Sequence, residues 1–496
     1  MLELKNITPR SYQEEIFETS KEKNTIVVLP TGTGKTLSAL LLAVYRLNKI
    51  KNSKVAIVSP TRPLNAQHLK TFKEHTTIDQ NEIVLLTGLI NQKKRKDLYN
   101  KRVIIATPQT LKEDLSKNIF SFKDFSALII DEAHRAIGNY AYTYLTKKYI
   151  EESEFPRILA LTASPGGNKQ KIDEICKNLS IEAVEIRTEE DIKEYIQEKN
   201  IRWLNVDLPN SLKHINNLIK TAYKEKLKGI QNLGFTKPLS LINKKDLILL
   251  QNQFRKSLNN KNPSAYYGIS LTALLLKIDY ASELLETQGI SPLLDFWNKL
   301  EKDQTKAAKN LLKMKQIQEA ISLTKELHEK DIRHPKLYML KGIIKKEIQQ
   351  NPKSKIMVFT NYRNTVEEIL NFLGKEDNIN ATKLIGQKSG LTQKEQIETI
   401  KKFEDGIYNV LIGTSIMEEG INVSTGAELA IFYDSVPSEI RVVQRSGRVG
   451  RLKAGKIIFL LTNDTREIGY YWASRKKEKI MKKTLQKMQQ KNLENF

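Results

Sequence analysis

Short apolar runs separated by helical stretches dominate the first part of the chain. They fall at residues 25–29, 55–58, 83–86, 103–105, 127–130, 158–161 and 183–186. Each run is bounded by turn or capping residues, as buried parallel strands usually are. The pattern predicts a doubly wound α/β domain over residues 1–204, with its chemistry at the carboxyl ends of the strands.

The pattern changes between residues 205 and 350, where apolar residues recur at helical spacing and short β-like runs disappear. We predict a basic, all-helical domain there. Strand-like runs return at 355–359, 381–385, 410–412, 428–433 and 456–461. They predict a second α/β domain over 351–465, followed by a basic helical tail over 466–496.

The charge balance points to a polyanionic partner. The chain has 81 Lys and Arg against 57 Asp and Glu, a net charge of +24. Nucleic acid is the simplest partner, because each cation that meets a phosphate releases a counterion; a lysine-rich coding bias is the alternative. No apolar stretch is long enough for a bilayer and no signal peptide precedes the domain, so we expect a cytoplasmic protein. The single cysteine, Cys176, excludes an internal disulfide and a Cys-rich zinc site.

A glycine-rich loop follows the first predicted strand. Residues 30–36 read PTGTGKT and open a helical stretch, which is the strand–loop–helix context of a phosphate-binding P-loop. Lys35 is placed to reach the β- and γ-phosphates, and the Thr36 hydroxyl is placed to ligate Mg²⁺. The alternative is a turn that only caps a helix. The residues assigned to ATP in this loop are Thr31, Gly32, Thr33, Gly34, Lys35 and Thr36.

An acidic pair ends another predicted strand. Asp131 and Glu132 follow the apolar run 127–130 and begin the sequence Asp-Glu-Ala-His. An NTPase holds Mg²⁺ at such a strand end, so Asp131 is the predicted metal ligand and Glu132 the predicted base for the attacking water. His134 would link this site to the other domain. A polar N-cap after a strand is the alternative interpretation.

The second α/β domain supplies candidate arginine fingers. In the segment 444–451, Arg448 and Arg451 are spaced i, i+3 and can aim at one nucleotide, with Gln444 beside them. An isolated arginine cluster is more often a surface patch. The upstream P-loop and acidic pair favour the catalytic interpretation.

These motifs together resemble those of superfamily 2 helicases. Residues 9–13 resemble the Q-motif, in which Gln13 would read the adenine edge and Arg10 belongs to the same nucleotide-binding segment. Other segments resemble motif Ia (59–62), Ib (106–109), III (161–166), IV (359–363) and V (413–420). The resemblance implies nucleic-acid contacts by Pro60, Thr61, Arg62, Thr107, Pro108, Thr360, Asn361, Gln387, Thr414 and Ser415, and coupling roles for His134, Thr162, Ser164 and Gly420.

Longer matches narrow the resemblance to the family of the archaeal helicase–nuclease Hef and the Fanconi anaemia group M translocase. They lie at 131–142, 283–289, 386–387, 390–396, 436–441 and 471–475. The resemblance implies two RecA-like domains, at 1–204 and 351–465, flanking a thumb-like helical insertion domain at 205–350. It also implies an ATP- and Mg²⁺-dependent motor that favours forked or branched DNA, associated with an archaeal nucleoid.

The sequence departs from this family in two ways. Asn422 stands where the family usually has a ribose-binding Asp, so it keeps a hydrogen-bond acceptor but no charge. Hef continues into a nuclease, whereas no metal-nuclease cluster appears in these 496 residues. If the chain is complete, we expect a motor without its own nuclease, with a separate nuclease as a candidate partner.

The end of the chain resembles a peptide that binds the sliding clamp PCNA. Gln490, Leu493 and Phe496 have the spacing of its glutamine, aliphatic and aromatic anchors, although a second aromatic is missing. A frayed basic helix end is the alternative. Trp203, Trp297 and Trp472 could stack bases, but we expect them in core or inter-domain packing.

Three functions are compatible with these motifs. The leading interpretation is a DNA helicase or translocase that acts on branched DNA in replication-fork repair. An RNA-directed superfamily 2 motor is the second. The third is an ATP-switched scaffold that recruits a nuclease or the clamp.

Overall fold

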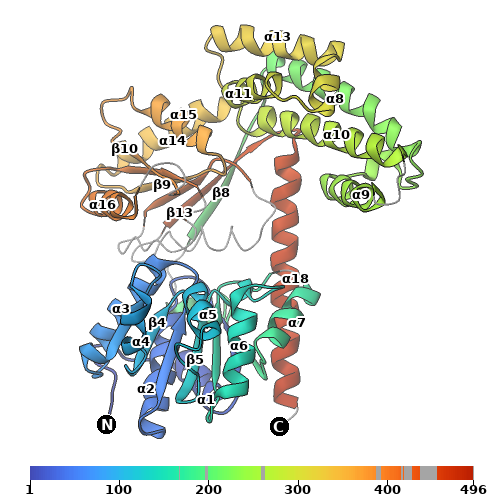
Figure 1. Ribbon diagram of the computed structural model, residues 1–496. Coiled ribbons are helices and arrows are strands. Elements are labelled where there is room, and N and C mark those ends of the chain that lie inside the picture. Colours follow the sequence, from blue (N-terminus) through green and yellow to red (C-terminus); the bar gives the residue numbers. More distant parts are fainter. Residues whose placement is uncertain are drawn as a thin grey trace.

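The computed structural model describes residues 1–166, 168–195, 199–258, 263–386, 392–414, 417, 427–435 and 455–494. Two parallel β-sheets form separate α/β domains, and a helical insert stands beside the second one (Figure 1). A long C-terminal helix, drawn in red, runs from the second domain to the first. The predicted fold class, two doubly wound α/β domains with an all-helical insertion, is therefore confirmed.

The first domain is built on a seven-stranded parallel sheet with the order β3-β4-β2-β5-β6-β1-β7. Every strand predicted from an apolar run is present, and helices cover both faces. In β1, for example, Ile26 and Val28 enter one core while Val27 enters the other. The strands are β1 (Thr25–Val28), β2 (Lys54–Val58), β3 (Ile83–Leu86), β4 (Val103–Ala106), β5 (Phe125–Asp131), β6 (Ile158–Thr162) and β7 (Ala183–Ile186). The helices are α1 (Ser11–Glu22), α2 (Lys35–Lys49), α3 (Arg62–His75), α4 (Gln92–Leu98), α5 (Pro108–Ser116), α6 (Ala141–Glu152) and α7 (Lys169–Asn178).

The second domain has a six-stranded parallel sheet with the order β10-β11-β9-β12-β13-β8. The five predicted strands are β9 (Ile356–Phe359), β10 (Ala381–Leu384), β11 (Val410–Gly413), β12 (Leu429–Phe432) and β13 (Gly455–Thr462). The sixth, β8 (Lys199–Val206), pairs with β13 although it precedes the insert in the chain. The first domain thus ends before residue 199 and not at residue 204 as predicted. An edge strand such as β8, with exposed Arg202 and Asn205, shows no continuous apolar run.

The insert consists of α8 (Asn210–Gln231), α9 (Lys244–Ser257), α10 (Pro263–Thr287), α11 (Ile290–Glu301), α12 (Lys306–Leu312) and α13 (Lys315–Glu329). It has its own core around Ile219, Leu285 and Trp297. Helix α14 (Pro335–Gln350), predicted to be part of the insert, packs instead in the second domain, where Leu340 and Ile344 share a core with β9. The pattern of α14 is helical in either location, so periodicity alone misplaced the boundary at residue 350. Helices α15 (Arg363–Leu373) and α16 (Gln393–Glu404) complete the second domain.

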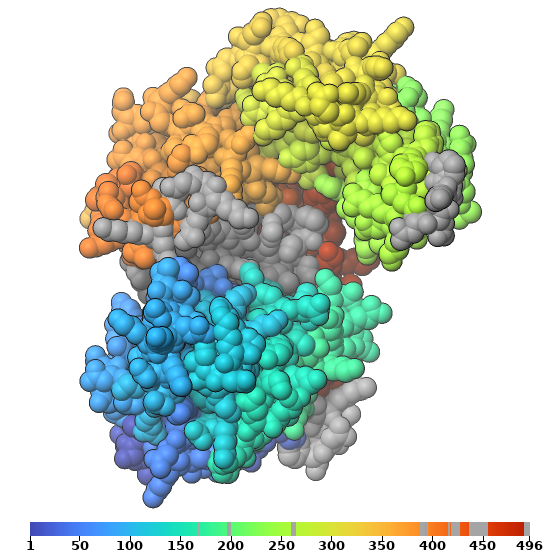
Figure 2. Space-filling model, in the orientation of Figure 1, coloured from blue at the N-terminus to red at the C-terminus, as the bar shows by residue number. Residues whose placement is uncertain are grey.

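The predicted tail is one helix, α18 (Arg466–Glu494), and it is not free of the domains. Met481 and Leu485 are buried in the core of the first domain, and Gln489 Nε2 donates to Glu185 Oε2 of β7 at 3.2 Å. In the space-filling view α18 is visible between the insert and the first domain (Figure 2). The helix thus connects the second domain to the first.

Across the described part of the chain, the helices lack the combination of length and apolar character that a membrane span requires.

Candidate nucleotide site and nucleic-acid-contacting turns

The P-loop joins β1 to α2 at the carboxyl edge of the first sheet. Gly32 and Gly34 have φ angles of +85° and +86°, a region that favours glycine. A Cβ on Gly34 would also lie 2.4 Å from Gln13 Nε2. Lys35 Nζ donates to two carbonyl oxygens of its own loop, at 3.1 and 3.4 Å. The loop therefore has the backbone shape, the helix N-terminus and the ammonium group that phosphate binding requires.

The Q-motif residues brace this loop. The Tyr12 hydroxyl donates to Thr33 O at 2.5 Å, and Gln13 Nε2 donates to the same oxygen at 3.2 Å. Gln13 Oε1 accepts from the Arg10 N–H at 2.9 Å. Because both ends of the buried Gln13 amide bind protein, its contact with adenine stays a prediction. The Arg10 guanidinium lies 4.9 Å from the ring centre of Tyr195, a neighbour that the sequence analysis missed.

Asp131 is the last residue of β5. Its Oδ2 accepts from His68 Nε2 and its Oδ1 from the Glu132 N–H, both at 2.9 Å. Burial alone would raise the pKa of Asp131, but the hydrogen bond from His68 and the charges of His68 and Lys35 hold it below its ordinary value. The carboxylate therefore stays ionised, which is the form that binds a divalent cation.

Three of the residues predicted to couple hydrolysis to movement, His134, Thr162 and Ser164, lie together beside Glu132. Glu132 has a φ of +51°, a strained conformation for a residue with a side chain and one that occurs often at active sites. Its Oε2 lies 3.2 Å from His134 Nδ1, which in turn lies 3.3 Å from Thr162 Oγ1. The Ser164 N–H donates to Thr162 Oγ1 at 3.1 Å. A polar chain thus leads from the predicted base to the end of β6.

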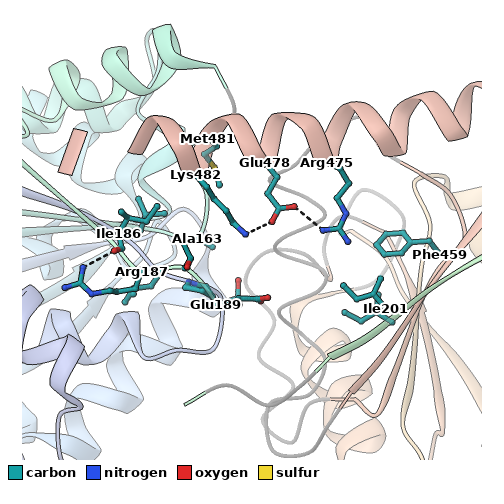
Figure 3. Close-up of a pocket in the computed structure, with 16 residues that line it drawn as sticks. Ala163, Ile186, Arg187, Glu189, Ile201, Phe459, Arg475, Glu478, Met481 and Lys482 are labelled. Carbon is teal, nitrogen blue, oxygen red and sulfur yellow. Dashed lines mark hydrogen bonds and ion pairs between the residues drawn. The ribbon is translucent and has the colours of Figure 1, made fainter. Parts of the chain in front are cut away.

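The series of polar contacts that begins at Glu132 continues into α18. The Ser164 hydroxyl donates to Met481 Sδ at 3.0 Å. Beside this contact, a cavity of about 90 Å³ lies between the start of the P-loop, the second sheet and α18 (Figure 3). On its α18 side, Glu478 pairs with Arg475 at 3.4 Å and with Lys482 at 3.1 Å. Helix α18 therefore contacts Ser164, the last member of the series of polar contacts that begins at Glu132.

The candidate nucleic-acid contacts of the first domain lie at the carboxyl ends of adjacent strands. Residues 60–62 join β2 to α3, and residues 107–108 join β4 to α5. The Thr61 side chain accepts from the Leu64 N–H at 3.4 Å and caps α3. The N-termini of α3 and α5 therefore face the same edge of the sheet, where backbone N–H groups can bind phosphates.

The contacts predicted for the second domain occupy the equivalent edge. Thr360 and Asn361 follow β9, and Thr414 follows β11, its neighbour in the sheet. Thr360 is buried and donates to Asp434 Oδ2 at 2.7 Å, and the Asn361 amide donates to Asp434 as well. These side chains are turned toward protein, so their contacts with nucleic acid stay predictions.

The segment 283–289 of α10 anchors the insert to the second domain. Gln288 Nε2 donates to Asp434 Oδ2 at 3.1 Å, so the same carboxylate holds the insert and the turn after β9. Glu286 accepts from Arg466 Nε at 3.0 Å. A fully buried ion pair between Lys336 and Glu467 joins α14 to the start of α18. The insert, the second domain and α18 are therefore fastened together.

Several predicted site residues lie outside the described residues: Gln387, Ser415, Gly420, Asn422, Gln444, Arg448, Arg451 and Phe496. Gln490 is exposed on the last turns of α18. Trp297 is buried as predicted, but Trp203 and Trp472 are 47% and 65% exposed. Core or inter-domain packing was predicted for all three tryptophans; Trp297 lies in the core of the insert, whereas Trp203 and Trp472 each contact the ring of Tyr471 and stay partly exposed. Cys176 packs at the edge of the first core, and burial raises the pKa of its thiol to about 11.

The residues at the site fit a nucleotide-bound Mg²⁺. Thr36 and the ionised Asp131 would hold it, and Mg²⁺ typically takes one or two protein ligands in addition to phosphates and water. Within the described ranges, three or more His, Cys, Asp or Glu side chains do not gather into a separate metal site.

Comparison with known proteins agrees with this geometry. Residues 10–172 match the DEAD/DEAH box helicase family, and residues 336–453 match the helicase conserved C-terminal domain. Residues 211–331 match a family described as putative ATP-dependent RNA helicase, helical bundle. These three segments correspond to the first domain, the second domain and the insert.

Individual relatives cover most of this chain. The putative ATP-dependent RNA helicase MJ1505 of Methanocaldococcus jannaschii is 39% identical over 98% of this chain and 62% of its own length. The ATP-dependent DNA helicase fml1 of Schizosaccharomyces pombe is 32% identical over 93% of this chain and 58% of its own. The chain thus spans less than two thirds of these curated relatives. The crystal structure of the Pyrococcus furiosus Hef helicase domain is 39% identical, with a TM-score of 0.71, and the match covers 94% of this chain and 98% of that one.

Two RecA-like sheets with a P-loop, a DEAH strand end and these matches define a superfamily 2 helicase core. The insert and the identity to the Hef helicase domain over its full length narrow the class. The chain belongs to the Hef family of superfamily 2 helicases.

Proposed function

We propose that this chain is an ATP-driven DNA helicase or translocase that acts on forked or branched DNA. The observation that carries the proposal is the attachment of the insert to the carboxyl edge of the second sheet, where the turns predicted to contact DNA lie. Asp434 accepts hydrogen bonds from Gln288 of the insert and from Thr360 and Asn361 of the turn after β9. A movement of the second domain would therefore carry the insert with it.

The ATP cycle supplies that movement. Lys35 and the P-loop backbone bind the β- and γ-phosphates, and Glu132 takes the proton of the attacking water. Mg²⁺, held by Thr36 and Asp131, would neutralise charge that develops on the transferring phosphoryl group. Arg448 and Arg451 would complete the site from the second domain and report the loss of the γ-phosphate to it.

The turns at the carboxyl ends of the two sheets would contact the sugar–phosphate backbone of one DNA strand without reading its bases. The insert would select the branch, because its surface carries an excess of Lys and Arg. It would also move with the DNA-contacting turns of the second domain and not with those of the first. The net charge of +24 supports a polyanion substrate.

RNA is the second candidate substrate, and specific descriptions favour it. The relative MJ1505 and the family matched by the insert are both described as RNA helicases, whereas fml1 is described as a DNA helicase. A labelled three-way fork and an RNA duplex of the same sequence, each incubated with ATP, separate the two. Remodelling of the fork alone supports the proposal, and remodelling of the RNA alone overturns it.

The variant Lys35→Ala separates a motor from a scaffold. It should lose fork remodelling and keep fork binding, because the P-loop ammonium acts on ATP and not on DNA. Complementation of a fork-repair defect by this variant would instead show that recruitment, not hydrolysis, is the function.

The sliding clamp and a separate nuclease are the proposed protein partners. Gln490, Leu493 and Phe496 would fill the pocket of the clamp. Deletion of residues 493–496 should abolish clamp binding in a pull-down with purified PCNA and leave the ATPase rate unchanged. Equal capture of the truncated and full chains would refute the clamp assignment.

A further inference from the structure

Helix α3 connects the nucleic-acid-contacting turn of the first domain to the predicted metal ligand. It begins at Arg62, within the turn that follows β2. Two polar residues of α3, Asn65 and His68, have exposed fractions of 0% and 3% and so lie in the interior of the domain. Their i, i+3 spacing places them one turn apart on the same face of the helix.

Asn65 holds the backbone of the turn. Its Nδ2 donates to Ser59 O and to Thr61 O, both at 3.0 Å. The two carbonyl oxygens flank Pro60, so the shape of the turn depends on the position of Asn65. Phosphate bound at this turn would therefore act on α3 through Asn65.

His68 holds the carboxylate of Asp131. Its Nε2 lies 2.9 Å from Asp131 Oδ2. Because an ionised carboxylate only accepts hydrogen bonds, the Nε2 nitrogen must carry the hydrogen and donate it. The Tyr142 hydroxyl donates to the backbone oxygen of the same aspartate at 2.6 Å, which fixes the main chain but leaves the carboxylate to His68 and the Glu132 N–H.

Asn65 and His68 each use only part of their hydrogen-bonding capacity. Asn65 Oδ1 and His68 Nδ1 are buried and have no hydrogen-bond partner among the described residues. An aliphatic face would pack here without that cost, since a buried polar atom without a partner destabilises the fold. A purely structural core histidine would have hydrogen-bond partners at both ring nitrogens, and within the described part of the chain His68 has one only at Nε2.

We propose that Asn65 and His68 form a rigid link by which nucleic acid bound at the turn after β2 positions Asp131 for catalysis. His68 is then a positioning residue: it orients the metal-binding carboxylate and touches neither ATP nor DNA. The link rests on the proposed function, because it presupposes that DNA stimulates ATP hydrolysis. A shift of α3 caused by phosphate at its N-terminus moves the Nε2 donor and re-aims the carboxylate.

The test uses the full chain with His68→Leu, which removes the donor, and His68→Gln, which keeps a donor at a similar reach. Affinity for a fluorescent methylanthraniloyl-ATP is measured with and without Mg²⁺, and ATPase rates are measured with and without forked DNA. For His68→Leu we expect the Mg²⁺-dependent gain in nucleotide affinity and the DNA-stimulated rate each to fall about 10- to 100-fold, as for other outer partners of metal ligands. Affinity without Mg²⁺ should stay within about twofold, and His68→Gln should recover most of the loss.

Asn65→Leu tests the other end of the link. It should lower the DNA-stimulated rate while leaving the basal rate and the Mg²⁺-dependent nucleotide affinity unchanged. Glu74→Gln, on an exposed position of the same helix, is the matched control and should behave as wild type. Thermal melting checks that each variant is folded. If His68→Leu does not fold, Asn65→Leu decides the question, because a wild-type DNA-stimulated rate in that variant would overturn the proposal.

Where His68→Leu folds, two results would overturn the proposal. One is an unchanged Mg²⁺-dependent affinity in His68→Leu. The other is a loss in His68→Gln as large as in His68→Leu, which would indicate a packing role only. Absence of DNA stimulation in the wild-type chain would instead refute the proposed function, and the nucleotide-affinity measurements distinguish that failure because they contain no DNA.

Discussion

At the residue scale, Gly34 illustrates how one position can be fixed by two independent constraints. Its φ is +86°, and a Cβ there would meet Gln13 Nε2 at 2.4 Å. Gly34→Ala should therefore destabilise the first domain by about 1–2 kcal/mol from backbone strain alone. It should also displace Gln13 and weaken ATP binding.

Gly88→Ala is the control for that substitution. Gly88 has open space around its Cβ position and is not among the glycines with positive φ. Its substitution should change stability by less than about 0.5 kcal/mol. Equal melting temperatures and equal nucleotide affinities for the two variants would contradict this account of the P-loop.

Glu368 on α15 gives a pH-dependent prediction. Burial raises its pKa from 4.5 to about 7, and one carboxylate oxygen has no hydrogen-bond partner among the described residues. The folded state therefore holds this proton more tightly than the unfolded chain does. Stability is lost as the pH rises from about 4.5 to about 7, since the unfolded chain releases the proton first.

Glu368→Gln, which stays neutral, should remove that loss. We expect it to raise the free energy of unfolding of the second domain by about 2–3 kcal/mol at pH 8 and by less than about 1 kcal/mol at pH 5. The neighbouring Glu367, whose pair with Lys383 is partly exposed, is the control, because such pairs contribute little. A gain in Glu368→Gln that does not depend on pH would show that charge is not its cause.

The residues that the sequence alone revealed and those that it missed differ in kind. Lys35, Asp131 and Glu132 were predicted because their chemistry is encoded in short motifs at strand ends. His68 was missed because its meaning lies in a contact with a residue 63 positions away. Tyr195 and Asp434 were missed for the same reason, since only the folded chain brings them to Arg10 and Thr360.

At the element scale, apolar periodicity located the buried strands well and the boundaries less well. A strand with helices on both faces must be apolar throughout, so its sequence is distinctive. Edge strand β8 lacks that signal, and α14 has the same helical pattern whichever domain it covers. Which domain an element joins depends on tertiary contacts that periodicity does not report.

Helix α18 gives the clearest prediction at this scale. Leu485 is fully buried in the core of the first domain, although α18 begins in the second. Leu485→Ala should cost about 2–5 kcal/mol, as for other buried leucines. It should lower the melting temperature of the first domain and, by freeing Met481 from Ser164, reduce the DNA-stimulated ATPase rate.

Gln486→Ala, one residue further along and exposed, should leave both quantities unchanged. If Leu485→Ala melted like wild type, the helix would not be docked on the first domain in solution. A melting change without any change in ATPase rate would show that docking is structural only.

At the scale of the whole molecule, the structure divides into two working parts. The first domain carries the P-loop, the acidic pair and one set of strand-end turns. The second carries the other set of turns together with the insert, which is fastened through Asp434 and Arg466. Helix α18 connects the parts, and the polar chain from Glu132 to Ser164 ends on it.

This arrangement explains why charge and motif alone could predict a nucleic-acid motor but not its substrate. The P-loop, the acidic pair and the strand-end turns are shared by DNA- and RNA-directed superfamily 2 proteins. Substrate choice would lie in how the insert sits on the second domain, and that depends on long-range contacts of Glu286 and Gln288.

The central claim, a motor driven by branched DNA, is tested most directly by the steady-state ATPase rate at one fixed salt concentration. The rate is compared without nucleic acid and with single-stranded DNA, duplex DNA, forked DNA, a four-way junction and duplex RNA. We predict that forked DNA and the junction stimulate hydrolysis most strongly, because only they engage both sets of turns and the insert. Stimulation by RNA alone, or by no nucleic acid, would contradict the account.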